Sequence, residues 1–424
     1  MNKIIFVLCA SLCVSAPIQA EPVYFTDVSV ISMSSESVLE HQTVVVDDGR
    51  ITAIAPSATL RLGPGKKIDG EGRFLIPALA EMHAHVPGPG NGEQYVQDLL
   101  SLYLVNGITT IRGMLGQPGH LELRQALAEH KMTGPRLITS GPSFNASSVS
   151  SPEQAARMAR AQHAAGYDFL KLHPGLSRDE YLEFVATAKS LGIPFAGHVS
   201  VHVGIPLTLE SGQATIDHLD GYGQDMDDGE IHAVAVATAE AGVWNVPTQS
   251  LMENRYAGRS LDELMARPEM AFVRSGTVSN WSNRVLAAHR SVEEDEAAAF
   301  MRVRRELIRQ LHKSGAGLLL GSDAPQIMNV PGFSIHEELQ FLVNAGLSPY
   351  EALATGTVNV ARFFDEDDRG QIEPGMVADM VLLNDNPLEN ISNTRKIEGV
   401  IRDGRWFDRA WLDKTLDGVR DRKI

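Results

Sequence analysis

Short apolar runs alternate with longer amphipathic stretches along the middle of the chain, and this alternation predicts the fold. Strands separated by helices pair in parallel. We therefore expect an α/β protein in which residues 76–364 form a (β/α)8 barrel of the TIM type. An open doubly wound sheet is the alternative, but no glycine-rich phosphate-binding motif follows an early strand. The eight strand-like runs lie at residues 74–83, 108–114, 135–141, 167–172, 193–198, 214–219, 242–248 and 316–323.

Capping signals mark several of the intervening helices. Ser151, Ser177 and Ser348 each stand three residues before Gln or Glu, which is the spacing of an N-terminal capping box. Glycine is the residue that most often follows the last turn of a helix. The glycines at such positions here are Gly192, Gly242 and Gly315.

The two ends of the chain have a different pattern. Residues 21–75 and 365–424 contain short alternating segments punctuated by Asp-Gly and Gly-Pro-Gly, which are typical of small antiparallel strands and hairpins. We expect the two ends to pair into one β-sandwich domain into which the barrel is inserted.

One connection is far longer than the others, because residues 249–315 separate the seventh and eighth runs. We interpret part of it, Met252–Ser282, as a loop or short helices that overhang the site. A peripheral excursion without a part in catalysis is an equal alternative.

The first twenty residues have the pattern of a secretory signal peptide. Lys3 precedes an apolar run at 4–14, and Ile18-Gln19-Ala20 forms a small-residue cleavage site. We expect an exported, periplasmic or extracellular protein. The two cysteines, Cys9 and Cys13, lie within this leader, so any metal in the remaining chain must be held by nitrogen and oxygen atoms.

Overall charge argues against some partners. The chain has 37 Lys and Arg against 53 Asp and Glu, a formal charge of −16, so nucleic acid is a poor partner. Beyond the leader, no apolar run approaches the ~20 residues that a membrane span needs.

Metal-ligating residue types end several of the strand-like runs. His83 and His85 are one residue apart, so they point to the same side of a strand and can bind one ion together. His198 and His218 end the fifth and sixth runs, and Asp323 ends the eighth. In a barrel of parallel strands these ends meet at one face. The pattern predicts a metal site, for which zinc is the first choice.

Lys171 ends the fourth run between apolar neighbours. A free lysine is cationic and repels metals, but a buried amine can lose its proton and add CO2. The resulting carbamate is an anionic oxygen donor able to bridge two ions. The alternative is a lysine whose ammonium reaches solvent.

Other polar residues follow the runs and are candidate substrate contacts. Arg112 ends the second run and could hold a substrate carboxylate with two hydrogen bonds, although an ion pair within the protein fits equally well. His120, His173 and Tyr222 also lie in expected strand-end loops. Glu337 and Glu338 fit an amphipathic helix better than the site.

With these motifs the chain resembles the amidohydrolase superfamily, and within it the imidazolonepropionase-like and prolidase-like branch. The resemblance covers nearly the whole chain, from VVVDDGRITAIAP and IPALAEMHAHV through FLKL, AGHVS, IDHLD and GSDAP to GQIEPGMVADMVLLNDNPL. Ala78 and Glu81 depart from it, since the family has Gly and Asp there. The resemblance implies that His83 and His85 bind the more buried ion.

By the same resemblance, carboxylated Lys171 bridges two ions, and His198 and His218 bind the second. Asp323 is then both a ligand and the proton shuttle. The implied reaction is cleavage of an amide bond in a dipeptide-like or N-acyl amino-acid substrate, by attack of a metal-bridging hydroxide. The alternatives are a one-metal cyclic-amide hydrolase or deaminase with unmodified Lys171, and a lactone or phosphotriester hydrolase. A homo-oligomer is compatible with the resemblance.

Overall fold

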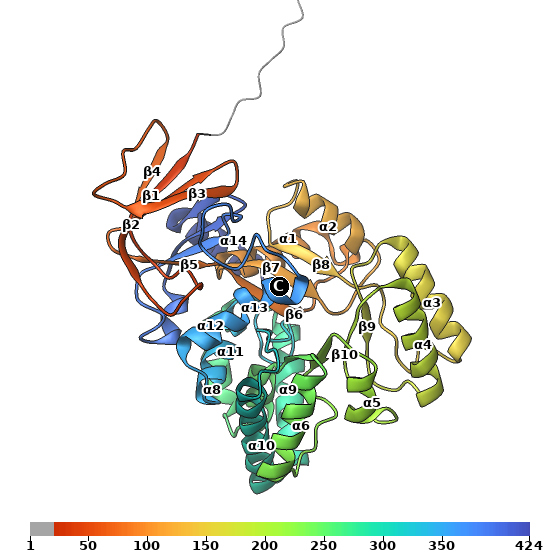
Figure 1. The fold of residues 1–424 in the computed structure, drawn as a ribbon. Coiled ribbons are helices and arrows are strands. Elements are labelled where there is room, and N and C mark those ends of the chain that lie inside the picture. Colours follow the sequence, from red (N-terminus) through yellow and green to blue (C-terminus); the bar gives the residue numbers. More distant parts are fainter. Residues whose placement is uncertain (1–20) are drawn as a thin grey trace, which may run out of the picture.

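The computed structural model describes residues 21–424 and has a mixed α/β fold (Figure 1). The expected leader, residues 1–20, and both cysteines lie outside the described residues. Within residues 21–424, no helix combines the length and apolar character needed to cross a bilayer.

Strands from the two ends of the chain form one eight-stranded sheet, in the order β15-β14-β13-β5-β1-β2-β3, with β4 beside β1. β5 joins the two ends by pairing antiparallel with β13, and in Figure 1 the red N-terminal and blue C-terminal segments lie together. The expectation of antiparallel strands is wrong for β4 and β5, which both pair with β1 in parallel. The strands are β1 (Val23–Val30), β2 (Leu39–Asp47), β3 (Arg50–Pro56), β4 (Lys66–Asp69), β5 (Phe74–Pro77), β13 (Met380–Leu383), β14 (Ile397–Arg402) and β15 (Arg405–Asp408).

Seven of the eight central runs contain parallel strands. One sheet has the order β6-β7-β8 and a second β12-β11-β10-β9. The first run is divided: its beginning is β5 of the terminal sheet, and only its end is the central strand β6. The central strands are β6 (Leu79–Ala84), β7 (Ile108–Gly113), β8 (Arg136–Thr139), β9 (Leu170–Leu172), β10 (Phe195–Gly197), β11 (Thr215–Asp217) and β12 (Trp244–Val246).

Isolated parallel bridges continue the pairing between these sheets. Ser140 bridges to Phe169, and the eighth run, at 316–323, is held by bridges from Leu318 to Asn245 and from Ala324 to Ala84. The run approaches β12 so closely that a Cβ on Gly317 would lie 2.1 Å from the Trp244 ring. Glycine is therefore required where this run passes the tryptophan.

Helices follow the central strands, and their starts agree with the capping signals. The hydroxyl of Ser151 accepts from the backbone N–H of Gln154, while Ser177 and Ser348 each complete a capping box. The helices up to β12 are α1 (Glu93–Val105), α2 (His120–Ala128), α3 (Pro152–Ala165), α4 (Arg178–Leu191), α5 (Gly204–Glu210) and α6 (Asp228–Glu240), with a short 3-10 helix η1 (Pro89–Asn91).

The long connection after β12 is helical through most of its length. Over Met252–Ser282 it consists mainly of short helices, as expected, although a long helix begins at Ser275 and a second long helix follows beyond that range. In Figure 1 these helices stand beside α6. The connection contains α7 (Gln249–Tyr256), α8 (Leu261–Met265), the 3-10 helix η2 (Pro268–Phe272), α9 (Ser275–Ser291) and α10 (Glu294–Lys313).

The remaining helices follow the eighth run, and some of them pack on the central strands, since Val360 lies in one apolar cluster with Ala80 and Met82 of β6. α14 contacts α1, β14 and β15, and α11 contacts η3. They are α11 (Phe333–Asn344), α12 (Pro349–Thr355), α13 (Val358–Phe364), η3 (Ile391–Arg395) and α14 (Arg409–Arg422).

Candidate metal centre

The four histidines expected to bind metal lie together at the carboxyl ends of the central strands. The ring centroid of His218 is 4.5 Å from that of His83 and 4.6 Å from that of His198. The centroids of His83 and His85 are 5.5 Å apart. Residues from β6 and from the turns after β10 and β11 therefore converge on one small region, although they are far apart in the sequence.

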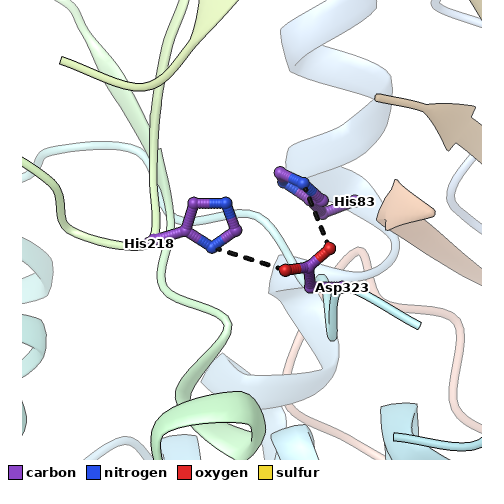
Figure 2. A group of neighbouring side chains, drawn as sticks. All are labelled: His83, His218 and Asp323. Atoms are coloured by element: carbon purple, nitrogen blue, oxygen red, sulfur yellow. Dashed lines mark ion pairs between the residues drawn. The ribbon is translucent and has the colours of Figure 1, made fainter. Parts of the chain in front are cut away.

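Asp323 lies among these imidazoles, and Figure 2 shows its carboxylate between His83 and His218. Its Oδ1 is 2.6 Å from Nε2 of His85 and 3.5 Å from Nε2 of His83. Its Oδ2 is 4.0 Å from Nδ1 of His218. One donor atom from each of His83, His218 and Asp323 lies within 4.8 Å of the others, a spacing suitable for one ion.

Hydrogen bonds orient two of the imidazoles. Nδ1 of His218 is 2.8 Å from the hydroxyl of Thr248, and Nδ1 of His198 is 2.5 Å from Oδ2 of Asp220. Metal-ligating histidines typically use one ring nitrogen in this way and present the other to the ion. In both residues Nε2 is the nitrogen left available for a metal.

Lys171 and Asp217 form a buried ion pair beside the histidines. Both side chains are fully buried, and Nζ of Lys171 donates to Oδ2 of Asp217 at 2.9 Å. The same oxygen lies 3.3 Å from Nδ1 of His83. The expected position of Lys171, buried at a strand end, agrees with the structure, but its carboxylate partner was not foreseen.

Burial dominates the electrostatics of the cluster. It lowers the pKa of His83 to about 4, with the charge of Lys171 acting in the same direction. It also lowers the pKa of His218 well below the ordinary value, and the pKa of Lys171 despite the opposing effect of Asp217. For Asp323, burial opposes ionisation, but His85 and His83 outweigh it and hold the pKa below its usual range. The site thus favours neutral imidazoles at His83 and His218 and an ionised carboxylate at Asp323, the protonation states of metal ligands.

Two buried polar atoms in the cluster lack a hydrogen bond to any described residue. They are Nδ1 of His83 and Oδ1 of Asp323, whose close contact with His85 does not have hydrogen-bond geometry. Leaving such atoms unpaired costs about 1–3 kcal/mol each, so buried polar atoms usually have a partner. A cation bound among nitrogen and oxygen donors would provide one. The donor set therefore fits a divalent metal.

The backbone is strained at the same place. His218, Thr248 and Asp323 have φ of 61°, 48° and 64°, in the left-handed region that non-glycine residues rarely adopt. Strain of this kind is retained where surrounding contacts enforce it, and it concentrates at functional sites.

Buried polar side chains hold the strained turns in position. Oε1 of Glu81 accepts from the backbone N–H groups of His83 and Ser322, which ties β6 to the turn carrying Asp323. Arg304 of α10 donates to the backbone oxygens of His218 and Pro247 at 2.7 and 2.8 Å. Glu81 thus positions the turn that carries Asp323 against β6.

A family model described as the amidohydrolase family matches residues 74–407. The chain belongs to the amidohydrolase family. Members of this family are metal-dependent hydrolases that act on carbon–nitrogen bonds, which agrees with the donor set.

Individual relatives within this family are distant. Adenine deaminase 3 of Rhizobium johnstonii is 24% identical over 363 residues, which cover 84% of this chain and 53% of the relative. The chain spans about half the length of the curated relatives it matches. Among solved structures, a bottromycin amidohydrolase aligns with a TM-score of 0.75 at 22% identity, covering 94% of this chain and 90% of that one. A Xaa-Pro dipeptidase with bound methionine aligns with a TM-score of 0.70 at 20% identity, covering 91% and 100%.

The four expected substrate contacts lie in different surroundings within this amidohydrolase. The ring of His173 stacks on His198 with centroids 4.9 Å apart, so it borders the cluster. Arg112 is buried and donates to Asp217 at 3.4 Å and to the backbone oxygen of Met82, which is the ion pair within the protein that the sequence left open. The guanidinium group of Arg112 therefore has no pair of neighbouring N–H groups left free to bind a substrate carboxylate.

The other two expected contacts also form hydrogen bonds within the protein, although Nε2 of His120 is buried without a partner among the described residues. His120 is buried at the start of α2, where Nδ1 accepts from the backbone N–H of Gln117. The hydroxyl of Tyr222 bonds to Thr238 and Asn245 at 3.1 and 3.0 Å. None of these hydrogen bonds joins His120 or Tyr222 to a histidine of the cluster.

Sequence reasoning overlooked Asp217, although a signal was present. Thr215 and Asp217 are two residues apart in β11 and therefore point to the same side, and they bond to each other at 2.8 Å. Glu338 is helical as expected, but it is also buried and accepts from the backbone N–H groups of Gln249 and Ser250 at the start of α7.

Proposed function

We propose that this protein is an exported amidohydrolase with two divalent metal ions, zinc in the first instance, which cleaves an amide bond in a dipeptide-like or N-acyl amino-acid substrate. The observation that carries the proposal is the convergence of four histidines, Lys171 and Asp323, with unpaired buried atoms on His83 and Asp323. We further propose that the central strands and bridges constitute a (β/α)8 barrel at 76–364, and that 21–75 and 365–424 form a separate β-domain.

The residues divide between two ions in this proposal. His83 and His85 would hold one ion and His198 and His218 the other, and a carbamate on Lys171 would supply oxygen ligands to both. The depressed pKa of Lys171, caused by burial, favours the neutral amine that reacts with CO2. Asp217 would then lie beside a second anion, which is tolerable only with cations close by.

Bound metal ions would supply Lewis-acid activation of water and of the scissile carbonyl. Asp323 accepts a proton from the attacking water, for which its carboxylate must be ionised, and its lowered pKa meets that requirement. The proton then passes to the leaving nitrogen, because an amine departs more readily than its anion. Asp220 and Thr248 keep His198 and His218 oriented throughout.

A second candidate is a one-metal deaminase or cyclic-amide hydrolase in which Lys171 remains unmodified. The 2.9 Å ion pair between Lys171 and Asp217 favours it, because this contact compensates a buried ammonium. The adenine deaminases among the relatives belong to this class of reaction.

Substrate screening of the zinc-loaded protein tests the proposal. The panel contains a dipeptide, an N-acyl amino acid, adenine, a lactone and a phosphotriester. Turnover of the dipeptide or N-acyl amino acid is expected. Adenine as the best substrate would favour the second candidate, and turnover of the lactone or phosphotriester alone would contradict amide hydrolysis.

Asp323→Asn tests the proton transfer. Loss of general acid–base catalysis typically lowers kcat by about 10²–10⁴-fold. The variant should fall by this factor and retain most of its metal, measured by steady-state kinetics and elemental analysis. Asp228→Asn is the matched control, since Asp228 is 83% exposed on α6. An unchanged kcat in the Asp323→Asn variant would remove Asp323 from the reaction.

A further inference from the structure

Two adjoining cavities share a wall formed by α7. The smaller, about 210 Å³, is lined by His218, Asp220 and Met252, and therefore adjoins the metal centre. The larger, about 480 Å³, lies among α7, α9 and α10. Arg255 and Tyr256 line both. Arg255 and Tyr256 therefore lie between the cavity at His218 and the larger cavity.

The larger cavity collects positive charge in an otherwise acidic protein. Three arginines line it, Arg255, Arg259 and Arg305, against one acidic residue, Glu294. Two of the three are already paired: Arg305 donates to Glu253 at 2.8 Å, and Arg259 to Glu337 at 3.3 Å.

Arg255 differs because its guanidinium forms no ion pair or hydrogen bond with the described residues, and its Nε is buried without a partner. It lies over the ring of Tyr256, 4.9 Å from the centroid. Stacking on an aromatic ring holds the guanidinium plane in place and leaves its edge free for a planar anion. An unpaired buried N–H is costly, and a carboxylate is the partner that satisfies it with two hydrogen bonds.

The other residues that line the larger cavity indicate which kind of ligand side chain fits there. Apolar surface comes from Ala288 of α9, from Val292 between the helices, and from Ala297 and Met301 of α10. A side chain of moderate size and apolar character fits such a wall better than a charged one.

We propose that Arg255 is a substrate-binding residue that selects acyl amino acids or short peptides with a free carboxylate and an apolar side chain next to it. This inference rests on the proposed amide hydrolysis at the metal centre, which it makes more specific. It also gives the long connection after β12 a role in substrate selection.

The test measures binding separately from turnover. The zinc-loaded Asp323→Asn protein is titrated calorimetrically with N-acetyl-leucine, Ala-Leu and Gly-Ala-Leu, each as the free acid and as the C-terminal amide. At least one acid should bind tenfold or more tightly than its amide. Arg255→Met in the same background should reduce that ratio below threefold, and Arg255→Lys should restore part of it.

Arg290→Met is the matched control, because Arg290 is exposed on α9 outside both cavities, and it should keep the full preference. Circular dichroism and thermal unfolding establish that the Arg255 variants are folded. The assignment of Arg255 is overturned if no acid binds more tightly than its amide, or if Arg255→Met keeps the preference.

Turnover by the wild-type enzyme separates this failure from failure of the proposed function. Equal kcat/KM for acids and amides would overturn the Arg255 assignment and leave amide hydrolysis intact. Acid-selective binding without turnover of any of the six compounds would support Arg255 and contradict the proposed reaction.

Discussion

Asp217 lies beside the metal centre and contacts three of its buried neighbours. Its carboxylate contacts Lys171, Arg112 and His83 at 2.9, 3.4 and 3.3 Å, and its side chain is fully buried. Burial alone would raise its pKa, but Lys171 and His83 outweigh that effect and hold the pKa well below the usual value. In the metal-free protein, where Lys171 is unmodified, this carboxylate compensates the buried charges of Lys171 and Arg112.

Asp217→Asn should therefore destabilise the protein severely, because it leaves Lys171 and Arg112 without their anion. Breaking one side of a buried pair costs about 3–5 kcal/mol. The free energy of unfolding from urea titration of the metal-free protein measures this loss. Exposed Asp228→Asn, the same chemical change, should cost less than about 0.5 kcal/mol. Equal costs for the two variants would contradict the compensating role.

At the scale of elements, α11 connects two distant parts of the fold. Glu338 on this helix accepts from the first N–H groups of α7, and His336 on the same helix is 3.0 Å from the hydroxyl of Thr394 in η3. Both side chains are buried. Burial, followed by the charge of Arg395, lowers the pKa of His336 well below its ordinary value.

This depressed pKa makes a prediction about acid stability. The folded state keeps His336 neutral, while the unfolded chain protonates it as the pH falls through its ordinary pKa of 6.5. The unfolded state then binds more protons, so stability is lost as the pH falls. His336→Gln should make the acid slope of the unfolding free energy shallower by about 1 kcal/mol per pH unit between about pH 6 and 5.

Urea titrations across that range measure the slope. His232→Gln is the control, since His232 is exposed on α6 and its exchange should leave the slope unaltered. The same slope in the His336 variant and in the wild type would show that burial of His336 has no such effect.

At the scale of the whole molecule, regular patterns were predictable and close three-dimensional contacts were not. Period two placed His83 and His85 on one side of β6, and the order of runs predicted which strand ends would meet. The alternation of side chains also places Asp217 on the same side as Thr215. This was missed because β11 has only three residues.

Short helices were expected in the connection after β12, but the length of α9 escaped prediction because the apolar signal of this helix is weak. α9 buries only Trp281, Val285 and Ala288, one narrow stripe across 17 residues. No sequence pattern pointed to Arg255. Its proposed role in substrate binding depends on its contact with Tyr256 and on two cavities that separate helices form. The placement of the signal peptide at 1–20 remains a prediction.

The central claim is that one rim of the protein holds two metal ions, with Lys171 between them. Elemental analysis of the zinc-reconstituted, dialysed protein tests it most directly, with Lys171→Met alongside. We expect about two zinc ions per chain in the wild type and one or fewer in the variant. A wild-type protein that holds one ion or none, or a variant that still holds two, would contradict it.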